Sequence, residues 1–338
     1  MTREPPDPLL WRANQGKGMP HRAQSRRPAF FVYITGMESR KGIDAAAIGL
    51  MIALCLCWGL QQVAIKAIAE QVPPLFQVAL RSGMAAILVS ALMFARKERL
   101  GLGDGTWKPG ILVGILFALE FLFIGEALRF TSASHTVVFL YTAPIFAALG
   151  LQYKLPSERL RPIQWAGIGI SFAGILTAFY ARDPEGGGTA PASIMGDILA
   201  LMAGLSWGAT TVVIRCSRLS GTSATRTLLY QLAGAFAILM ITALATGQTG
   251  FRPTPMAWAS LLFQGVIVSF ASFLVWFWML RKYLASRLGT LSFMSPLFGV
   301  TFAIWLLDEP LDATFLIGSL LVLGGILLVT GTERKPSA

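Results

Sequence analysis

The sequence predicts an all-α integral membrane protein with ten transmembrane helices, arranged as two inverted five-helix repeats. Three observations lead to this prediction: long apolar runs, the distribution of basic residues between them, and matching residues in the two halves. The chain has 338 residues, of which 54% are hydrophobic and 13% are charged. Soluble domains carry about 25% charged residues, so this composition argues against a cytosolic enzyme, a nucleic-acid-binding protein and a disordered chain.

Ten apolar runs are each long enough to cross a bilayer, which takes about 20 residues of helix. Turn residues or charges separate them. The runs are continuously apolar, whereas the strands of a membrane β-barrel alternate polar and apolar residues over about 10 positions. They therefore predict helices, over residues 45–68, 75–95, 109–128, 133–153, 163–180, 194–214, 227–246, 257–280, 288–307 and 313–331.

The first 43 residues differ from the rest because they hold eight basic residues and several prolines. No apolar core with a cleavage site follows these charges, so the segment is not a signal peptide. We expect residues 1–43 to form a disordered basic tail and residues 332–338 a short C-terminal tail. Met37, just before the first run, is a second candidate for the start of translation.

Basic residues predict the orientation, because Lys and Arg concentrate on the cytoplasmic side of short loops. With ten spans and the N-terminus inside, 23 of the 28 basic residues fall in cytoplasmic segments. Only Arg129, Arg182 and Arg252 fall in outer segments, while Lys66 and Arg81 lie within spans. We therefore expect both termini in the cytoplasm.

The two halves of the chain contain matching residues in the same order. Five spans per half is an odd number, so the second half must run inverted in the membrane. We expect the first repeat at residues 44–182 and the second at 194–331. Inverted repeats are typical of secondary transporters, which bind substrate between the halves near the midplane. The clearest matches, at offsets of 149 to 152 residues, are Trp58-Gly59 with Trp207-Gly208, Pro144 with Pro296, and Glu158 with Glu309.

Over about residues 45–331, the sequence resembles the EamA-type, ten-helix branch of the drug/metabolite transporter superfamily. The resemblance implies an inner-membrane carrier, usually an exporter of amino acids, metabolites or drugs, with a central cavity. It implies no single substrate. The second half departs from the pattern at Tyr230, which stands at the position of Arg81. The resembling residues are Trp58-Gly59, Ala64-Ile65-Lys66, Pro73-Pro74, Arg81, Ala143-Pro144, Glu158, Gly167 and Gly174, with Trp207-Gly208, Pro296, Glu309 and Gly318 in the second half.

Charged side chains within a span are costly and are therefore candidates for function. Glu120 lies 11 residues after Pro109, at the start of its run. At ~1.5 Å per residue it is about 16 Å into the span, close to the midplane. We expect it either to exchange a proton during transport or to hold a substrate ammonium; a neutral carboxyl hydrogen-bonded between helices is the alternative. Glu126 is expected to pair with Arg129 near the outer end.

Three further ionisable residues are candidates for charge coupling. Lys66, near the outer end of the first span, can extend its ammonium to the interface. Arg81, about two turns into the second span, is expected to pair with a carboxylate or with helix carbonyls. His135 begins the fourth span and can carry a proton, although an interfacial position without a function is the alternative.

Polar and aromatic residues of both halves are expected to line the substrate cavity. Trp58 and Gln62 are four residues apart and share a helix face, although amide packing between helices is the alternative. Mid-helix prolines at Pro144 and Pro296 are expected to kink their spans and to serve as hinges. The predicted lining residues are Trp58, Gln61, Gln62, Glu120, Tyr141, Trp207, Thr211, Trp276 and Phe293.

The sequence thus predicts a secondary transporter, not an enzyme. It is expected to move an amino acid or drug-like solute outward across the inner membrane by alternating access, with proton coupling through Glu120 as an added hypothesis. The sequence contains no phosphate-binding glycine loop and no metal cluster, so we expect no cofactor and no metal. The expected partners are the solute and the lipid bilayer, with a homodimer left open and no nucleic acid. A membrane-embedded, lipid-modifying transferase is the alternative.

Overall fold

The computed structural model describes residues 44–98, 104–154, 160–180, 190–283, 288, 291–292, 294–309 and 313–331. The predictions for both tails, for Glu158 and for Phe293 lie outside these residues. All of the elements within them are helices, and every predicted span contains one. In chain order they are α2 (Ala45–Ala67), α3 (Pro74–Ala95), α4 (Trp107–Phe130), α5 (Ala133–Leu140), α6 (Ala143–Lys154), α7 (Pro162–Tyr180), α8 (Ala190–Arg215), η4 (Arg218–Gly221), α9 (Ala224–Ala245), α10 (Pro255–Leu262), η5 (Phe263–Ser272), α11 (Phe273–Lys282), α13 (Met294–Leu307) and α14 (Ala313–Gly331).

The helices have the length and the surface of membrane spans. In the described part of the chain, seven helical segments of 22–25 residues are long and apolar enough to cross a bilayer. Three shorter apolar helices accompany them, at Pro162–Ala178, Met294–Leu307 and Ala313–Val329. Large apolar side chains such as Ile87 and Leu176 are exposed in the middle of their helices, where only lipid is a suitable neighbour. The prediction of an all-helical, multi-pass membrane protein is confirmed.

Side chains at the helix starts explain why the spans begin where they do. At the first residues of α2, α5, α9 and α10, the side chains of Asp44, Ser132, Ser223 and Thr254 each accept the backbone N–H three residues later. Such caps satisfy amides that have no partner within the helix. These caps therefore mark where the helices of the apolar runs begin.

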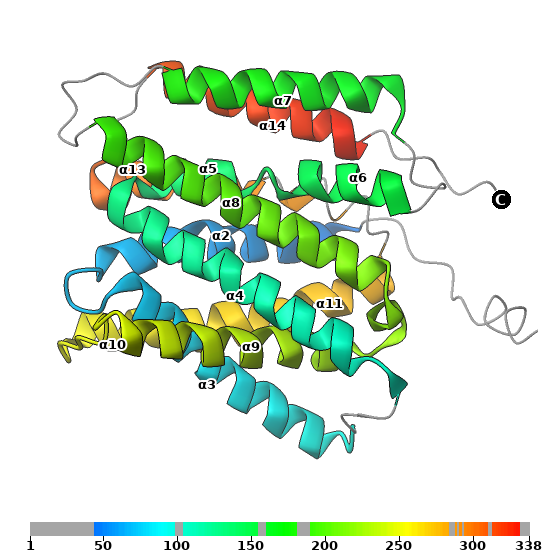
Figure 1. The fold of residues 1–338 in the computed structure, drawn as a ribbon, viewed down its shortest axis with the longest axis vertical. Helices are drawn as coiled ribbons and strands as arrows, with labels where there is room; N and C mark the ends of the chain where they lie inside the picture. The colour runs from blue at the N-terminus through cyan, green and yellow to red at the C-terminus, as the bar shows by residue number, and fades with distance from the viewer. Residues whose placement is uncertain are drawn as a thin grey trace, which may run out of the picture. The chain divides into compact units, whose positions relative to one another are not determined.

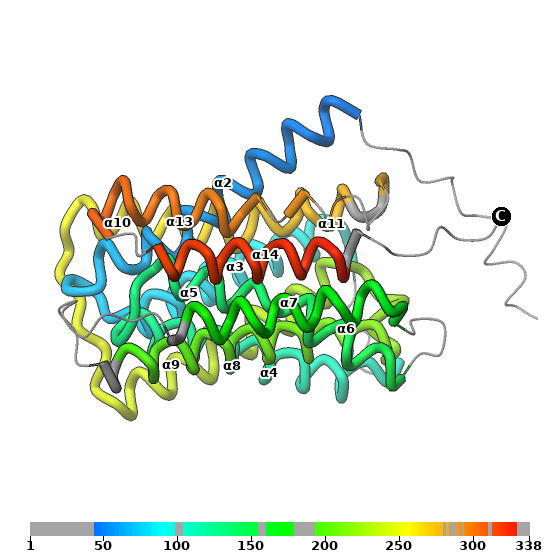
Figure 2. Tube along the Cα trace, turned by 90° about the horizontal axis from the view of Figure 1, so that it is seen from above, coloured from blue at the N-terminus to red at the C-terminus, as the bar shows by residue number. Residues whose placement is uncertain are grey.

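The spans run side by side, so that their ends lie at two opposite ends of the bundle (Figure 1, Figure 2). We call the end where α2 begins and α3 finishes the first end, and the opposite one the second end. Helix α7 packs against α14, α8 against α4 and α6, α9 against α3 and α4, and α13 against α2. Every one of these neighbouring pairs joins a helix of the first half to a helix of the second.

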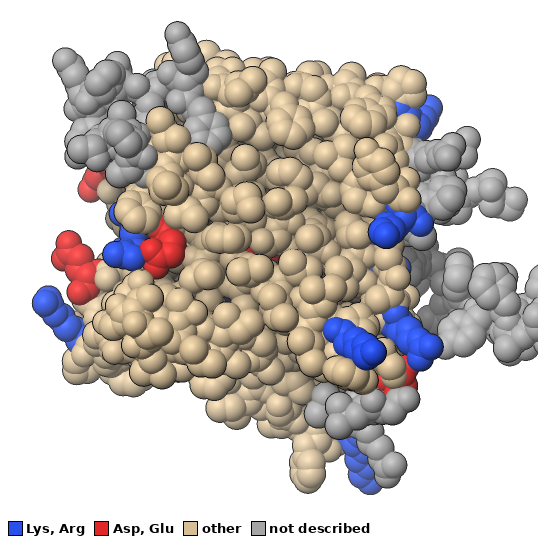
Figure 3. Space-filling view, in the orientation of Figure 1, with Lys and Arg blue, Asp and Glu red and all other residues tan. Residues whose placement is uncertain are grey.

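On the face seen in Figure 3, most of the surface charges gather at the two ends, and an apolar belt separates them. At the second end, Arg129 and Arg252 are outnumbered by the acidic residues Glu70, Glu126, Asp308 and Glu309. The basic surplus of the sequence therefore gathers at one end of the bundle. Among described residues, the first end carries Arg96, Lys97, Lys108, Lys154, Arg161, Arg215, Arg218, Arg226 and Lys282.

Glycines at matching positions hold equivalent helix pairs together. A Cβ atom added to Gly59 of α2 would lie 2.9 Å from the carbonyl oxygen of Ser295 in α13. A Cβ atom added to Gly208 of α8 would lie 2.8 Å from the carbonyl oxygen of Ala143 in α6. Ala143 precedes Ser295 by 152 residues, the offset that also relates Pro144 to Pro296. The sequence matches thus correspond to matching contacts.

Helices α7 and α14 pack in antiparallel directions through four glycines. A Cβ atom on Gly167 would lie 2.6 Å from the carbonyl oxygen of Gly325, and one on Gly174 would lie 2.6 Å from that of Gly318. Small residues permit this close approach of two backbones. Gly167 and Gly174 match Gly318 and Gly325 in the sequence repeat, so each helix meets its own counterpart running the opposite way, as inverted repeats require.

We predict that Gly174→Ala destabilises the protein because the new methyl group forces α7 and α14 apart. Overpacking of this kind costs about 1–3 kcal/mol, which would lower the unfolding temperature of the purified protein by several degrees. Gly169→Ala, five residues away on the exposed face of α7 with nothing within 4 Å of its added Cβ, is the matched control and should not lower it. Equal shifts for the two variants would contradict the assignment of the α7–α14 contact.

Candidate functional site

Two charged side chains, Arg81 of α3 and Glu120 of α4, are buried together in the bundle. Arg81 is 2% exposed and Glu120 is 5% exposed. The Arg81 guanidinium lies over the Phe121 ring, 4.2 Å from its centroid, and the charges of Arg81 and Glu120 are close enough to interact. Glu120 sits near the middle of α4, as its place in the apolar run predicts.

This buried pair is incompletely bonded. Nε and Nη1 of Arg81 and Oε2 of Glu120 have no hydrogen-bond partner, and the two side chains do not form an ion pair in direct contact. Buried charges are stable only when they are paired and hydrogen-bonded, and in a bilayer such residues mark binding sites and proton relays. The arrangement therefore offers one anionic and one cationic group to a third polar species.

A second polar group lies beside the pair. The Tyr141 hydroxyl faces Ser295 of α13 and is within electrostatic range of Glu120. Gln62 Oε1 is buried without a hydrogen-bond partner. The Tyr141 ring packs edge-on against Trp207 of α8, with their centroids 5.4 Å apart. The layer around Glu120 thus combines charged, hydroxyl and aromatic groups from both halves of the chain.

A tryptophan pair at α2 and α11 completes the aromatic surroundings. The rings of Trp58 and Trp276 meet edge to face, 5.5 Å between centroids. The Trp58 indole Nε1 donates to Ser272 Oγ at 2.9 Å. Ser272 ends η5, a ten-residue π-helical stretch within the eighth span. π-Helical turns are frequent at functional sites, and here a π-helical stretch positions the hydroxyl that accepts the Trp58 indole N–H.

The remaining predicted lining residues have less to offer a ligand. Gln61 is buried, and the Thr211 hydroxyl donates to the carbonyl oxygen of Trp207 within its own helix, at 3.2 Å. The structure therefore groups Glu120, Tyr141 and Trp207, with Gln62 buried on α2 and the Trp58–Trp276 pair on α2 and α11. Glu126 accepts from Arg129 at 2.6 Å, which confirms the predicted pair.

The two prolines lie at helix starts and not in mid-helix. The fourth span breaks between Leu140, the end of α5, and Ala143, the start of α6, so Pro144 is the second residue of α6. Pro296 is the third residue of α13. A proline in the first turn costs no hydrogen bond, because the first amides of a helix have no partner within it. Pro144 therefore begins a helix at a break, where the sequence predicts a kink, and Pro296 lies in the first turn of α13.

At the second end, His135 and Lys66 belong to one hydrogen-bonded network. His135 Nδ1 lies 3.1 Å from both carboxylate oxygens of Asp197 in α8. The same carboxylate accepts the Thr131 hydroxyl at 2.7 Å, and the Lys66 ammonium donates to the Thr131 carbonyl. The His135 ring stacks on Phe315 of α14 with centroids 3.9 Å apart. These contacts connect α2, the α4–α5 turn, α8 and α14.

Glu309 extends the network by capping α5. Its two carboxylate oxygens accept the backbone amides of Ala133 at 2.7 Å and Ser134 at 3.0 Å, and the Ser134 hydroxyl at 2.7 Å. A carboxylate is stabilised at a helix N-terminus by the helix dipole, and Lys66 lies within electrostatic range of it. The segment between α13 and α14 is thereby fastened to α5 and to α2.

Sequence reasoning missed Asp197, Thr131 and the capping role of Glu309. Asp197 is a carboxylate inside the predicted run 194–214, so the rule that selected Glu120 could have selected it. The sequence identifies Glu309 as the counterpart of Glu158 but predicts no capping role for it. Gln264 was also missed: its side-chain amide donates to the Gln77 side chain at 2.9 Å, joining η5 to α3.

We predict that Asp197→Asn loosens the second end, because an amide cannot replace the charged acceptor of Thr131 and His135. Losing charge-assisted hydrogen bonds costs about 1–3 kcal/mol. Hydrogen exchange in purified protein should therefore rise for residues 131–136 and for the start of α8. Glu126→Gln, which breaks an exposed ion pair at the same end, is the matched control; exchange that rises as much in the control would contradict the network's role.

Comparisons with known proteins agree with this architecture. A model described as the EamA-like transporter family matches residues 45–180 and, a second time, residues 194–331. An uncharacterized transporter of Bacillus subtilis is 25% identical over 286 residues, which cover 84% of this chain and 97% of the relative. Probable amino-acid metabolite efflux pumps of Salmonella typhimurium and Escherichia coli are 26% and 24% identical, over 82% of this chain and 93% of each relative.

The fold is also found among solved structures. One crystal structure aligns over 85% of this chain and 97% of its own, with a TM-score of 0.61 and 22% sequence identity. That likeness concerns the fold alone. The descriptions of the family and of the relatives indicate transport and not catalysis.

Proposed function

The chain belongs to the EamA-like transporter family, and on this premise we propose that it is a carrier of zwitterionic amino acids. The substrate sits between the two halves, and the carrier works by alternating access. The observation that supports this substrate class is the buried, incompletely bonded pair of Arg81 and Glu120. Two relatives described as probable amino-acid metabolite efflux pumps support it independently.

A zwitterion satisfies both members of the pair. Its carboxylate accepts two parallel hydrogen bonds from the Arg81 guanidinium, a geometry that arginine favours. Its ammonium donates to Glu120. Each buried charge then lies beside an opposite charge. The ligand thus offsets a cost of burial that apolar surroundings cannot offset. A solute with only one charge leaves the other protein group uncompensated.

The aromatic groups suit the rest of an amino acid. Tyr141, which is within electrostatic range of Glu120, meets Trp207 edge to face, and the Trp58–Trp276 pair adds further aromatic surface. Binding sites combine such apolar walls with a few polar groups that fix orientation. We therefore expect amino acids with apolar side chains to be preferred to strongly polar ones.

Alternating access requires ends that can open in turn. The network of Lys66, Thr131, His135, Asp197 and Glu309 fastens the second end between the halves. The break before Pro144 divides the fourth span into two short helices, and Pro296 lies in the first turn of α13, so α6 and α13 can pivot as units. In this proposal, both prolines act as hinges, and the repeats 44–182 and 194–331 rock against each other. The hydrogen bonds of the network break when the second end opens.

The distribution of charge supports an orientation. Lys and Arg prefer the cytoplasmic side, and the first end holds most of the described basic residues. We place the first end, and with it both termini, in the cytoplasm and the protein in the inner membrane. The second end faces outward, and transport is outward, as in the two named efflux pumps.

The substrate assignment predicts loss of exchange when either charge is removed. In counterflow with labelled phenylalanine and leucine, proteoliposomes of the wild-type protein should exchange both. Glu120→Gln and Arg81→Gln should each reduce exchange about tenfold or more, because each removes a charge-assisted bond. N-acetylphenylalanine, which lacks the ammonium, and phenylalaninamide, which lacks the carboxylate, should compete poorly.

Glu126→Gln is the control, since it removes a carboxylate of the same helix at the second end, and it should exchange as well as the wild type. Full exchange by both Glu120→Gln and Arg81→Gln would overturn the substrate assignment. Strong competition by both derivatives would also overturn it.

Glu120 also supports proton coupling, because a buried carboxyl between two access states can bind a proton on one side and release it on the other. In the wild type, a pH gradient should drive net transport of labelled phenylalanine. Glu120→Gln should lose the response to the gradient, even at substrate concentrations that restore its exchange. A Glu120→Gln variant that responds to every gradient as the wild type does would refute the coupling.

A further inference from the structure

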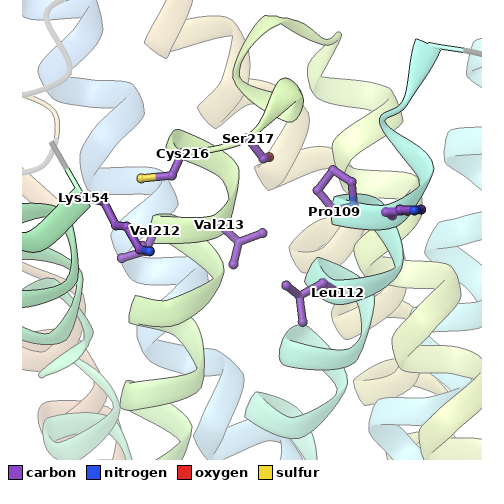
Figure 4. Close-up of a pocket in the computed structure, with 8 residues that line it drawn as sticks. Pro109, Leu112, Lys154, Val212, Val213, Cys216 and Ser217 are labelled. Carbon is purple, nitrogen blue, oxygen red and sulfur yellow. The ribbon is translucent and has the colours of Figure 1, made fainter.

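The structure contains a groove at the first end that the transport site does not use. It has a volume of about 390 Å³ and lies between the start of α4, the end of α6 and the end of α8 (Figure 4). Pro109 and Leu112 of α4 form one wall, and Val212 and Val213 of α8 form the other. Lys154 of α6 lines one side of the groove, and Lys108 of α4 lines the other. Two basic side chains thus flank an apolar groove.

The groove lies where a membrane lipid changes from headgroup to acyl chain. Lys108 is the second residue of α4 and Lys154 the last residue of α6, so both ammonium groups stand at the ends of apolar spans. Trp107, exposed beside Lys108 with its ring 5.5 Å from Nζ, is of the type that gathers at this level of a bilayer. The site is therefore at headgroup depth.

The wall of the groove continues into the lipid-facing surface. Leu112 is 45% exposed, and its neighbours Ile111 and Ile115 on α4 are 53% and 40% exposed. These side chains form an apolar strip that runs from the groove toward the middle of the span. An acyl chain can lie along this strip and remain in the hydrocarbon of the bilayer. A polar solute of the same size gains no favourable contact there.

Acidic residues near the rim are already engaged. Asp104 accepts from the Thr106 hydroxyl at 2.6 Å and forms an ion pair with Arg226. The hydrogen bonds from Thr106, aided by the Arg226 guanidinium, hold the pKa of Asp104 below its usual value. Glu98 accepts the hydroxyls of Ser223 and Thr225. In the described part of the chain, both carboxylates bind residues at the start of α9, and neither pairs with Lys108 or Lys154.

We propose that this groove binds one anionic glycerophospholipid, with its phosphate between Lys108 and Lys154 and an acyl chain along Leu112 and the α4 strip. Charge complementarity and the continuity of the groove with the lipid-facing surface select this occupant. Basic pockets between spans at the cytoplasmic side are suited to acidic headgroups. The site is independent of the amino-acid site, since it uses none of the same residues.

Lipid binding to the purified full chain provides the test, with phosphatidylglycerol and phosphatidylcholine as the probes in native mass spectrometry. The wild type should retain phosphatidylglycerol in preference to phosphatidylcholine. The double variant Lys108→Gln/Lys154→Gln should lose about tenfold in affinity for phosphatidylglycerol, because each basic residue adds to the attraction. Val213→Phe should weaken it without any change of charge, by filling the groove.

The matched control is Lys97→Gln/Lys282→Gln, which removes the same charge from the same end outside the groove. It should retain wild-type binding, and equal losses in the two double variants would reduce the effect to general attraction and overturn the proposal. So would undiminished phosphatidylglycerol binding by Lys108→Gln/Lys154→Gln. Competition by glycerol phosphate as strong as that by the intact lipid would assign the groove to soluble phosphates instead.

Discussion

The cost of leaving a polar group unsatisfied in hydrocarbon governs this structure. Helices satisfy the backbone, and hydroxyls such as that of Thr211 bond within their own helix. Several amide, indole and carboxyl groups inside the bundle instead find partners in other segments. Gln264 reaches Gln77, Trp58 reaches Ser272 and Asp197 reaches Thr131. Each bond joins two segments that are distant in sequence, and together they help to fix how the halves meet. The apolar faces supply contact, but it is the polar bonds that select one arrangement.

The same rule separates the second end from the centre. At the second end, the carboxylates of Glu309 and Asp197 accept hydrogen bonds from the stretch 131–134, where α4 ends and α5 begins. In the middle, Arg81 and Glu120 are buried as Asp197 is, but they keep atoms without hydrogen-bond partners. Polar groups are buried at both places, but only at the second end do hydrogen bonds from the same chain compensate for that burial. A transporter needs this difference, because a fully satisfied centre gives a substrate nothing to bind and a loosely bonded end cannot seal.

The spans were predictable because composition alone decides them: a run such as 227–246 has no charge and only one environment suits it. Glu120 was predictable for the same reason, as a charge in the middle of a run. The contacts of Asp197 and Glu309 were not, because they depend on which helices become neighbours. The π-helical stretch Phe263–Ser272 and the break before Pro144 depend on tertiary packing, and no local period in the sequence records them.

The repeat shows which parts of such a fold must be duplicated and which must differ. Gly59 and Gly208 occupy equivalent contacts, since two halves that pack through a two-fold axis need the same close approach twice. An amino acid has no such symmetry: one end is anionic and the other cationic. In the alignment of the halves, Tyr230 is the residue equivalent to Arg81. The stretch equivalent to Glu120, residues 268–272, contains no carboxylate. In the proposed function, symmetric packing with asymmetric charge lets a two-fold scaffold bind a zwitterion in one orientation.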